Sequence, residues 1–104
     1  MGRYKIEYTE VADRHLNTIK RRDGDYLSKI IDKIDFCLGE HLFGHIQQCD
    51  KKKLKGKKNT YRLHVQRKYT VFYTISDVEQ NKSVVVHMVM DYKAAHKKYS
   101  HIDL

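Results

Sequence analysis

The stretch that decides the fold runs from Tyr61 to Met90 and reads YRLHVQRKYTVFYTISDVEQNKSVVVHMVM. It is rich in Val, Tyr, Ile and Thr and is interrupted twice by short polar segments, which is typical of consecutive β-strands. The pattern predicts strands over residues 61–66, 69–76 and 83–90. Because connections this short join antiparallel neighbours, the three strands should form a meander.

The chain before the meander begins with a predicted strand and a helix. Residues 4–8 alternate apolar and charged side chains, the period-two pattern of a strand with one buried face. Apolar residues then recur at helical spacing over residues 11–22, and Thr9 is placed to cap that helix. Gly24 follows at the point where a left-handed C-terminal cap would fall.

A second helix is predicted to start with Asp25 as its N-cap and to end at Gly39. Its apolar residues recur at i, i+3, i+4, i+7 and i+11, which places them on one face. Since only a few residues connect the two helices, they should form an antiparallel pair that packs on one face of the sheet. The apolar face consists of Leu27, Ile30, Ile31, Ile34 and Leu38.

The expected fold class is α+β. We expect an N-terminal strand, an antiparallel helix pair and a three-stranded antiparallel meander, forming one curved sheet with the helices on one face. Residues 40–50 should form a loop or a single helical turn, and residues 93–99 should add a helical turn. The position of the first strand in the sheet stays open. A chain of 104 residues without proline or repeats is expected to form one domain over residues 1–104.

Composition narrows the possible partners. Hydrophobic residues make up 40% and charged residues 33%, too apolar for a disordered chain and too polar for a membrane protein. No membrane span or secretory signal is recognisable. The two cysteines, Cys37 and Cys49, are too few for a disulfide scaffold, so we expect reduced thiols and a cytoplasmic location. The formal charge of +8 favours a polyanionic partner, either nucleic acid or an acidic protein.

Basic side chains are expected to gather on the sheet face away from the helices. Six of the eight residues over 51–58 are lysines. Since side chains alternate along a strand, Arg62 and His64 should point away from the helices, next to a polar row on the second meander strand. Both faces of the third strand are apolar, so His87 is a candidate without a defined orientation. Such a face, with aromatic residues nearby, is suited to RNA.

Several strings in the chain, taken together, resemble one known family. In their order and spacing they are similar to the RelE/ParE superfamily of toxins from bacterial and archaeal type II toxin–antitoxin systems. The likeness extends from Tyr4 to about Tyr99, and a strand, a helix pair and a meander is also that family's order. The strings are Lys53-Leu54-Lys55-Gly56, Tyr61-Arg62-Leu63, Tyr69-Thr70-Val71-Phe72-Tyr73 and Val84-Val85-Val86.

The resemblance implies a metal-independent endoribonuclease that cuts mRNA on the ribosome, inhibits translation and is neutralised by an acidic antitoxin. In such a reaction a base removes the proton of a ribose 2′-OH, a cation stabilises the phosphate charge and an acid protonates the 5′ oxygen. No cofactor is implied. By position in the family pattern, the expected catalytic residues are Arg62, His64, Lys93, His96 and Tyr99. The expected RNA-binding residues are Lys51, Lys52, Lys53, Lys55, Lys57, Lys58, Arg67, Lys68 and His87.

One position departs from the family pattern. Many relatives have arginine after the first tyrosine of the second meander strand, where this chain has Thr70. Arg67, Lys68 or Arg62 would then have to supply the missing charge. Two alternatives stay open: a ParE-like poison of DNA gyrase, and a non-catalytic basic module that binds RNA or DNA.

Neither a zinc site nor a catalytic role for His15 is expected from the sequence. Cys37, His41, His45 and Cys49 recur every four residues, the spacing of metal-capable ligands along one helical face. Glycines interrupt that helix, and four ligands on one face cannot surround a metal tetrahedrally, so no metal site is expected. His15 lies on the apolar face of the first helix and is expected to be a packed histidine.

Overall fold

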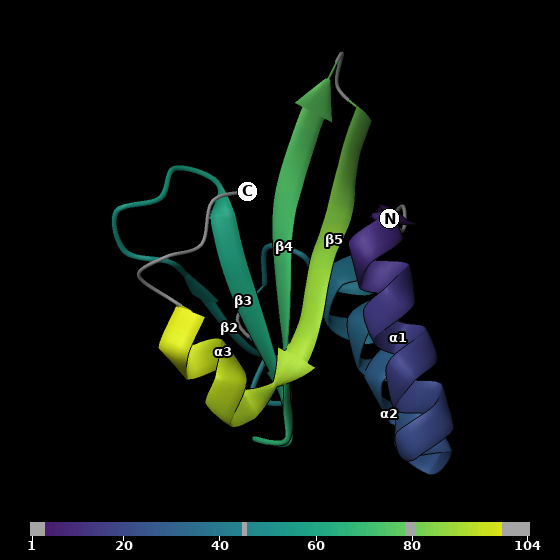
Figure 1. Ribbon diagram of the computed structural model, residues 1–104. Helices are drawn as coiled ribbons and strands as arrows, with labels where there is room; N and C mark the ends of the chain where they lie inside the picture. The colour runs from purple at the N-terminus through teal and green to yellow at the C-terminus, as the bar shows by residue number, and fades with distance from the viewer. Residues whose placement is uncertain (1–3, 45, 79–80, 99–104) are drawn as a thin grey trace.

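A computed structural model describes residues 4–44, 46–78 and 81–98, and its centre is a five-stranded sheet (Figure 1). The strand order is β1-β5-β4-β3-β2, and β3, β4 and β5 form the predicted antiparallel meander. β1 lies parallel to β5, which settles the position that the sequence left open. The strands are β1 (Lys5–Tyr8), β2 (Asp50–Lys53), β3 (Thr60–Val65), β4 (Tyr69–Val78) and β5 (Asn81–Asp91).

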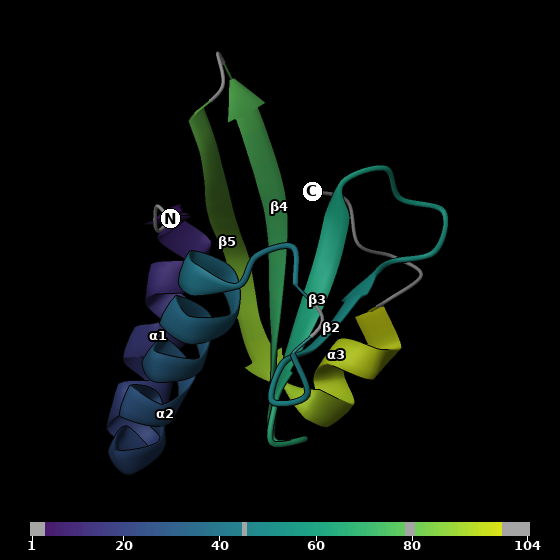
Figure 2. The same ribbon diagram turned by 180° about the vertical axis from the view of Figure 1, so that it is seen from behind.

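The predicted helix pair covers one face of the sheet. α1 (Glu10–Arg22) and α2 (Gly24–Ile34) run antiparallel on one side, as Figures 1 and 2 show from front and back. The side chain of Thr9 accepts a hydrogen bond from the Ala12 amide at 3.1 Å, so the predicted cap of α1 is confirmed. Fully buried residues from the helices and the strands form the core between them; they include Ile30, Ile34, Leu38, Leu63, Val71 and Val84.

The predicted helix boundaries after α1 are wrong in three places. Gly24 is not a left-handed cap but the first residue of α2, and Asp23, rather than Asp25, is the residue at its N-cap. The α-helix also ends at Ile34 and not at Gly39. A π-helix, η1 (Asp35–Glu40), continues the helical run to one residue beyond Gly39. Gly39 is buried there, and its carbonyl accepts a hydrogen bond from the amide of Tyr4.

The lysine-rich segment contains a strand that the sequence did not reveal. β2 pairs antiparallel with β3 and forms one edge of the sheet, with Lys52 opposite Arg62. Its sequence, DKKK, has no apolar alternation, which is the pattern by which strands are recognised. Lysines are nevertheless common on edge strands, because they discourage pairing with other chains.

A β-bulge in β5 explains why the two faces of that strand looked equally apolar. Phe72 pairs with Met88 but Tyr73 pairs with Val86, so His87 is an extra residue in the ladder. The extra residue reverses the alternation. Before the bulge Val84 and Val86 face the core, and after it Val89 does, leaving Met88 and Met90 on the opposite face.

The second face of the sheet carries a short helix of its own. α3 (Tyr92–Lys98) confirms the helical turn expected near the end of the chain and lies across the sheet from α1 and α2 (Figure 1). Ala95 packs there in a small apolar cluster with Leu54 and Phe72. The helix pair therefore covers one face of the sheet, as expected, and α3 covers part of the other.

Cys37 and Cys49 form a disulfide, so the expectation of reduced thiols is wrong. The chain leaves η1, passes through the connection after it and returns toward β2, which brings the two Cα atoms to 5.6 Å. Disulfides are rare in cytosolic proteins, and the cysteine count therefore no longer supports a cytoplasmic location. Within residues 4–44, 46–78 and 81–98, no helix is long and apolar enough to cross a membrane.

Reduction of this disulfide should lower the free energy of unfolding by about 3 kcal/mol, because the bond closes a short loop and restricts the unfolded chain. Urea denaturation with and without a reductant would measure the difference. The double variant with Cys37→Ala and Cys49→Ala is the control and should not respond to reductant. An unchanged midpoint for the reduced wild type would contradict the stabilising role.

Candidate active site

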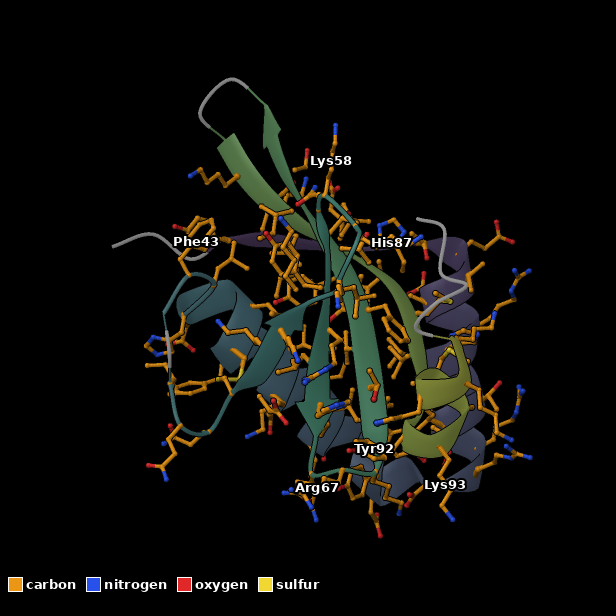
Figure 3. All side chains as sticks on the ribbon, turned by 90° about the vertical axis from the view of Figure 1, so that its left-hand side faces the viewer. Phe43, Lys58, Arg67, His87, Tyr92 and Lys93 are labelled. Atoms are coloured by element: carbon orange, nitrogen blue, oxygen red, sulfur yellow. A yellow bond between two sulfur atoms is a disulfide. The ribbon has the colours of Figure 1, made fainter. Side chains whose placement is uncertain are left out.

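A cleft of about 580 Å³ lies on the face that carries α3, between the β2–β3 edge of the sheet, the loop after β2 and α3. Figure 3 views this side of the molecule, with Arg67 and Tyr92 close together at its lower end. Most of the lining side chains are basic or aromatic. They are Asp50, Lys52, Lys53, Leu54, Lys55, Arg62, His64, Arg67, Tyr92 and His96.

His64 lies in the wall of this cleft, on β3. Its Nδ1 is 2.8 Å from the hydroxyl oxygen of Thr70, its partner across the β3–β4 ladder. Its ring lies 4.6 Å from that of Tyr92 and 5.9 Å from that of His96, measured between centroids, and the two histidine rings are almost parallel. The residue is only 7% exposed, so its neighbours on β4 and α3 fix the orientation of the imidazole.

Burial makes His64 a neutral imidazole at physiological pH. Loss of hydration, reinforced by the positive charge of Arg62, lowers its pKa from 6.5 to about 4. The carboxylate of Asp50 acts in the opposite direction but does not cancel this effect. The ring can therefore donate one hydrogen bond and accept another, but it carries no charge to attract a phosphate.

Arg62 is held next to His64 by Asp50. Its Nη1 donates to the Asp50 carbonyl oxygen at 3.0 Å and to the carboxylate at 3.1 Å, and its side chain is 13% exposed. An arginine fixed in this way keeps other N–H groups for a ligand, since the guanidinium has five donors. Asp50 was missed at the sequence level because β2, which places it opposite His64, was not recognised.

α3 supplies an exposed imidazole and an aromatic ring. His96 Nδ1 lies 3.1 Å from the Tyr92 carbonyl oxygen, one helical turn away, and the two rings are 4.6 Å apart. Both residues line the cleft, whereas Lys93 lies at the outer side of α3 (Figure 3) and does not. The structure thus brings His96, not Lys93, to His64. Tyr99 lies outside the described residues.

The lysine run divides into three parts with different surroundings. Lys51 points to the other side of the sheet, where its ammonium donates to the carbonyl oxygens of residues 37, 41 and 42, so it is not available to RNA. Lys52, Lys53 and Lys55 line the cleft. Lys57 and Lys58 do not, and Lys58 lies at the end of this face farthest from Arg67 (Figure 3).

Two further residues expected to bind RNA are engaged elsewhere. Lys68 forms a 2.7 Å ion pair with Asp23 and lies over the ring of Tyr26, on the helix side of the sheet. The ring of His87 faces the same side as the cleft but is hydrogen-bonded to Thr74 at 2.9 Å and is not part of the lining. Arg67, by contrast, lines the cleft.

The central spatial prediction is confirmed: Arg62 and His64 share the sheet face away from α1 and α2, close to lysines and to the C-terminal helix. His15 is a packed histidine, as expected, and its Nδ1 accepts a hydrogen bond from the Val89 amide. Cys37 and Cys49 are joined to each other, and His45 lies outside the described residues. Thr70 and Tyr92 are site residues that the sequence-based set omitted.

No protein-family model and no curated protein matches the chain, but solved structures do. The YoeB/ParE toxin from Agrobacterium tumefaciens has a TM-score of 0.68 and 17% identity, covering 84% of this chain and 96% of that one. The RelB–RelE complex from Methanococcus jannaschii has a TM-score of 0.62 and 20% identity, covering 93% of this chain and 99% of that one. The DinJ–YafQ complex from Escherichia coli has a TM-score of 0.64 and 17% identity, covering 88% of this chain and 96% of that one.

These likenesses establish the fold. The chain has the fold of the RelE/ParE superfamily toxins, as the sequence resemblance implied, with matches that cover nearly all of each neighbour. At 15–20% identity, the likeness concerns backbone architecture and not the side chains of the cleft. The chemistry of the site therefore has to be argued from this chain's own residues.

The low pKa of His64 predicts a pH-dependent stability. The unfolded histidine binds its proton with a pKa of 6.5 and the folded one with a pKa of about 4, so protons favour the unfolded chain. The free energy of unfolding should fall as pH falls from 6.5 to 4, by up to about 3 kcal/mol from this residue. Denaturation at several pH values should show a shallower slope for His64→Gln. An unchanged slope for this variant would contradict the neutral, buried state of His64.

Proposed function

We propose that this protein is the toxin of a type II toxin–antitoxin system and that its cleft is an endoribonuclease site that cuts mRNA, acts without a metal and so inhibits translation. The observation that carries the proposal is the pairing of His64 and His96 in one cleft, with Arg62 beside them. A ribonuclease of this kind needs a proton acceptor, a proton donor and a cation near one phosphate.

Binding of the RNA would rest on charge and stacking. Lys52, Lys53 and Lys55 are placed to contact consecutive phosphates along the β2 side of the cleft. Tyr92 offers an aromatic ring at the cleft wall on which a base can stack. A single-stranded segment fits this arrangement, since its bases are free to leave the helix and meet an aromatic side chain.

Proton transfer would be divided between two different histidines. His96 is the exposed one, at the mouth of the cleft, and is placed to exchange protons with the 2′-OH or with the departing 5′ oxygen. His64 stays neutral and is held by Thr70, so we assign it to hydrogen bonding with the reacting ribose or phosphate. Tyr99, which the sequence resemblance implies as a catalytic residue, is proposed as an alternative to His96 for completing proton transfer.

The positive charge of the chain also suggests its protein partner. The DinJ–YafQ and RelB–RelE neighbours were solved as toxin–antitoxin complexes, and we propose an acidic antitoxin for this chain, whose formal charge is +8. Cleavage would take place on the ribosome and in the cytoplasm, where mRNA is translated.

A ParE-like action on DNA gyrase is the second candidate, and Thr70 is the observation that favours it. The residue is fully buried and hydrogen-bonded to His64, at the position where many relatives carry an arginine. A gyrase poison would not need that cation. Expression of a gyrase poison should cause DNA damage and leave reporter mRNA intact, whereas the ribonuclease should cut the mRNA.

Neutralising two cleft lysines should weaken RNA binding and flatten its salt dependence. For about six phosphate contacts on single-stranded RNA, log affinity should fall with log salt at a slope of about −4. In a Lys52→Gln, Lys55→Gln variant the slope should become shallower by about 1, with an unchanged cleavage position. Filter binding at several salt concentrations measures the slope. A double variant with Lys20→Gln and Lys29→Gln, on the helix pair, has the same net charge and should keep the wild-type slope.

Removal of the exposed imidazole of His96 should strongly slow cleavage without loss of the fold. His96→Ala should reduce the cleavage rate by about a hundredfold or more, as expected for loss of a general acid or base. Primer extension on a reporter mRNA after induced expression detects the cut, and growth arrest reports toxicity. Lys93→Ala is the matched control, because Lys93 is also an exposed basic residue of α3 but lies outside the cleft. Equal activity of both variants would contradict the proposed site.

A further inference from the structure

The turn between β3 and β4 has an unfavourable backbone conformation. The Lys68 amide donates to the Val65 carbonyl oxygen at 3.0 Å, and the two residues between them, Gln66 and Arg67, have φ angles of 51° and 56°. Two central residues with positive φ are the mark of a type I′ turn, for which Asn-Gly is strongly preferred. Side chains as long as these are uncommon in the left-handed region. Such strain persists only where surrounding structure determines it.

Neighbours hold this turn on both sides of the sheet. On the helix side, the Tyr26 hydroxyl donates to the side-chain carbonyl of Gln66 at 2.7 Å, and Lys68 forms its ion pair with Asp23. On the cleft side, the amide of Tyr92 donates to the Lys68 carbonyl oxygen at 3.0 Å. These contacts tie the turn to both the helix pair and the start of α3. Arg67 lies in the chain between the two anchored residues, Gln66 and Lys68, and its side chain lines the cleft next to Tyr92 (Figure 3).

Arg67 has no acidic partner among the described residues, in contrast to the two cations nearest to it in the chain, Arg62 and Lys68. Arg62 is paired with Asp50, and Lys68 with Asp23. Among the described residues, no ion pair involves Arg67, although it lies close enough to His64 to lower the pKa of that imidazole. Its guanidinium therefore keeps its full charge and its planar fork of donors for a ligand in the cleft.

We propose that Arg67 is the cation that stabilises the charge on the reacting phosphate and that the type I′ turn aims it at that group. This inference rests on the proposed ribonuclease function. The 2′ oxygen forms a bond to phosphorus after giving its proton to a base, and the bond from phosphorus to the 5′ oxygen breaks as that oxygen takes a proton from an acid. Arg67 keeps its own proton and binds the non-bridging oxygens. It thereby replaces the arginine that is absent at Thr70.

The conformation of the turn allows a test that separates catalysis from folding. Arg67→Gly removes the guanidinium but suits a positive φ, so the variant should have an unchanged or higher Tm. Its cleavage rate at saturating RNA should fall by about a hundredfold or more, with a much smaller change in KM, because the charge acts mainly in the transition state. Single-turnover cleavage of a defined RNA and thermal unfolding measure the two quantities.

Gln66→Gly is the matched control. It relieves the same kind of backbone strain one residue earlier and keeps the guanidinium, but it also removes the acceptor of the Tyr26 hydrogen bond. Its cleavage rate should therefore match that of Tyr26→Phe and stay far above that of Arg67→Gly. Tyr26→Phe removes the hydrogen bond that orients the turn, so Tyr26 is a positioning residue. This variant should lose part of the rate with KM little changed, and Arg67→Lys should be intermediate because ammonium lacks the fork.

The outcomes distinguish this inference from the function on which it rests. If the wild-type protein cleaves no RNA with or without ribosomes, both proposals fall. If the wild type cleaves and Arg67→Gly cleaves as fast, only the role of Arg67 falls. If Arg67→Gly raises KM and leaves the maximal rate unchanged, Arg67 is a phosphate anchor and the proposed transition-state role is wrong.

Discussion

The site depends on the packing of α3 against the sheet through Ala95, Leu54 and Phe72. A helix of seven residues is too short to be stable alone, so this small apolar cluster must supply its stability. By docking there, the helix brings its two ring-bearing residues against His64, which belongs to a strand nearly thirty positions earlier in the chain. The same contact buries His64 and thereby lowers its pKa. Geometry and electrostatics of the cleft therefore have one origin.

This origin explains why two histidines with parallel rings have different surroundings. His64 is packed between Tyr92 and Thr70 and loses its hydration, whereas His96 lies on the outer side of the stack and stays exposed. Burial that lowers the pKa of one histidine gives that residue a role of its own in acid–base chemistry. Two equally exposed imidazoles would not differ in hydration in this way. The positive charge of Arg62, beside the buried ring of His64, lowers the pKa of His64 further.

Sequence reasoning predicted the regular parts of the fold and the face on which the site lies. The meander, the helix pair and the shared face of Arg62 and His64 follow from hydrophobic periodicity, which is a local signal. The edge strand β2 was missed because its four residues are all charged, and with it the contact of Arg62 to Asp50. The bulge at His87 was missed because both faces of β5 are apolar. The disulfide was missed because the positions of two cysteines in a sequence do not show whether the fold brings them together.

Three departures from regular structure, the bulge, the π-helix and the left-handed turn, lie next to elements that line the cleft. The bulge turns Met88 and Met90 to the side where α3 docks. The π-helix places Cys37 for its bond to Cys49, which directly precedes β2 and the residue that holds Arg62. The left-handed turn directs Arg67 into the same space. Local irregularity is costly and tends to persist where function requires it. Three irregularities next to one cleft are a physical reason, separate from any likeness to toxins, to place the proposed activity there.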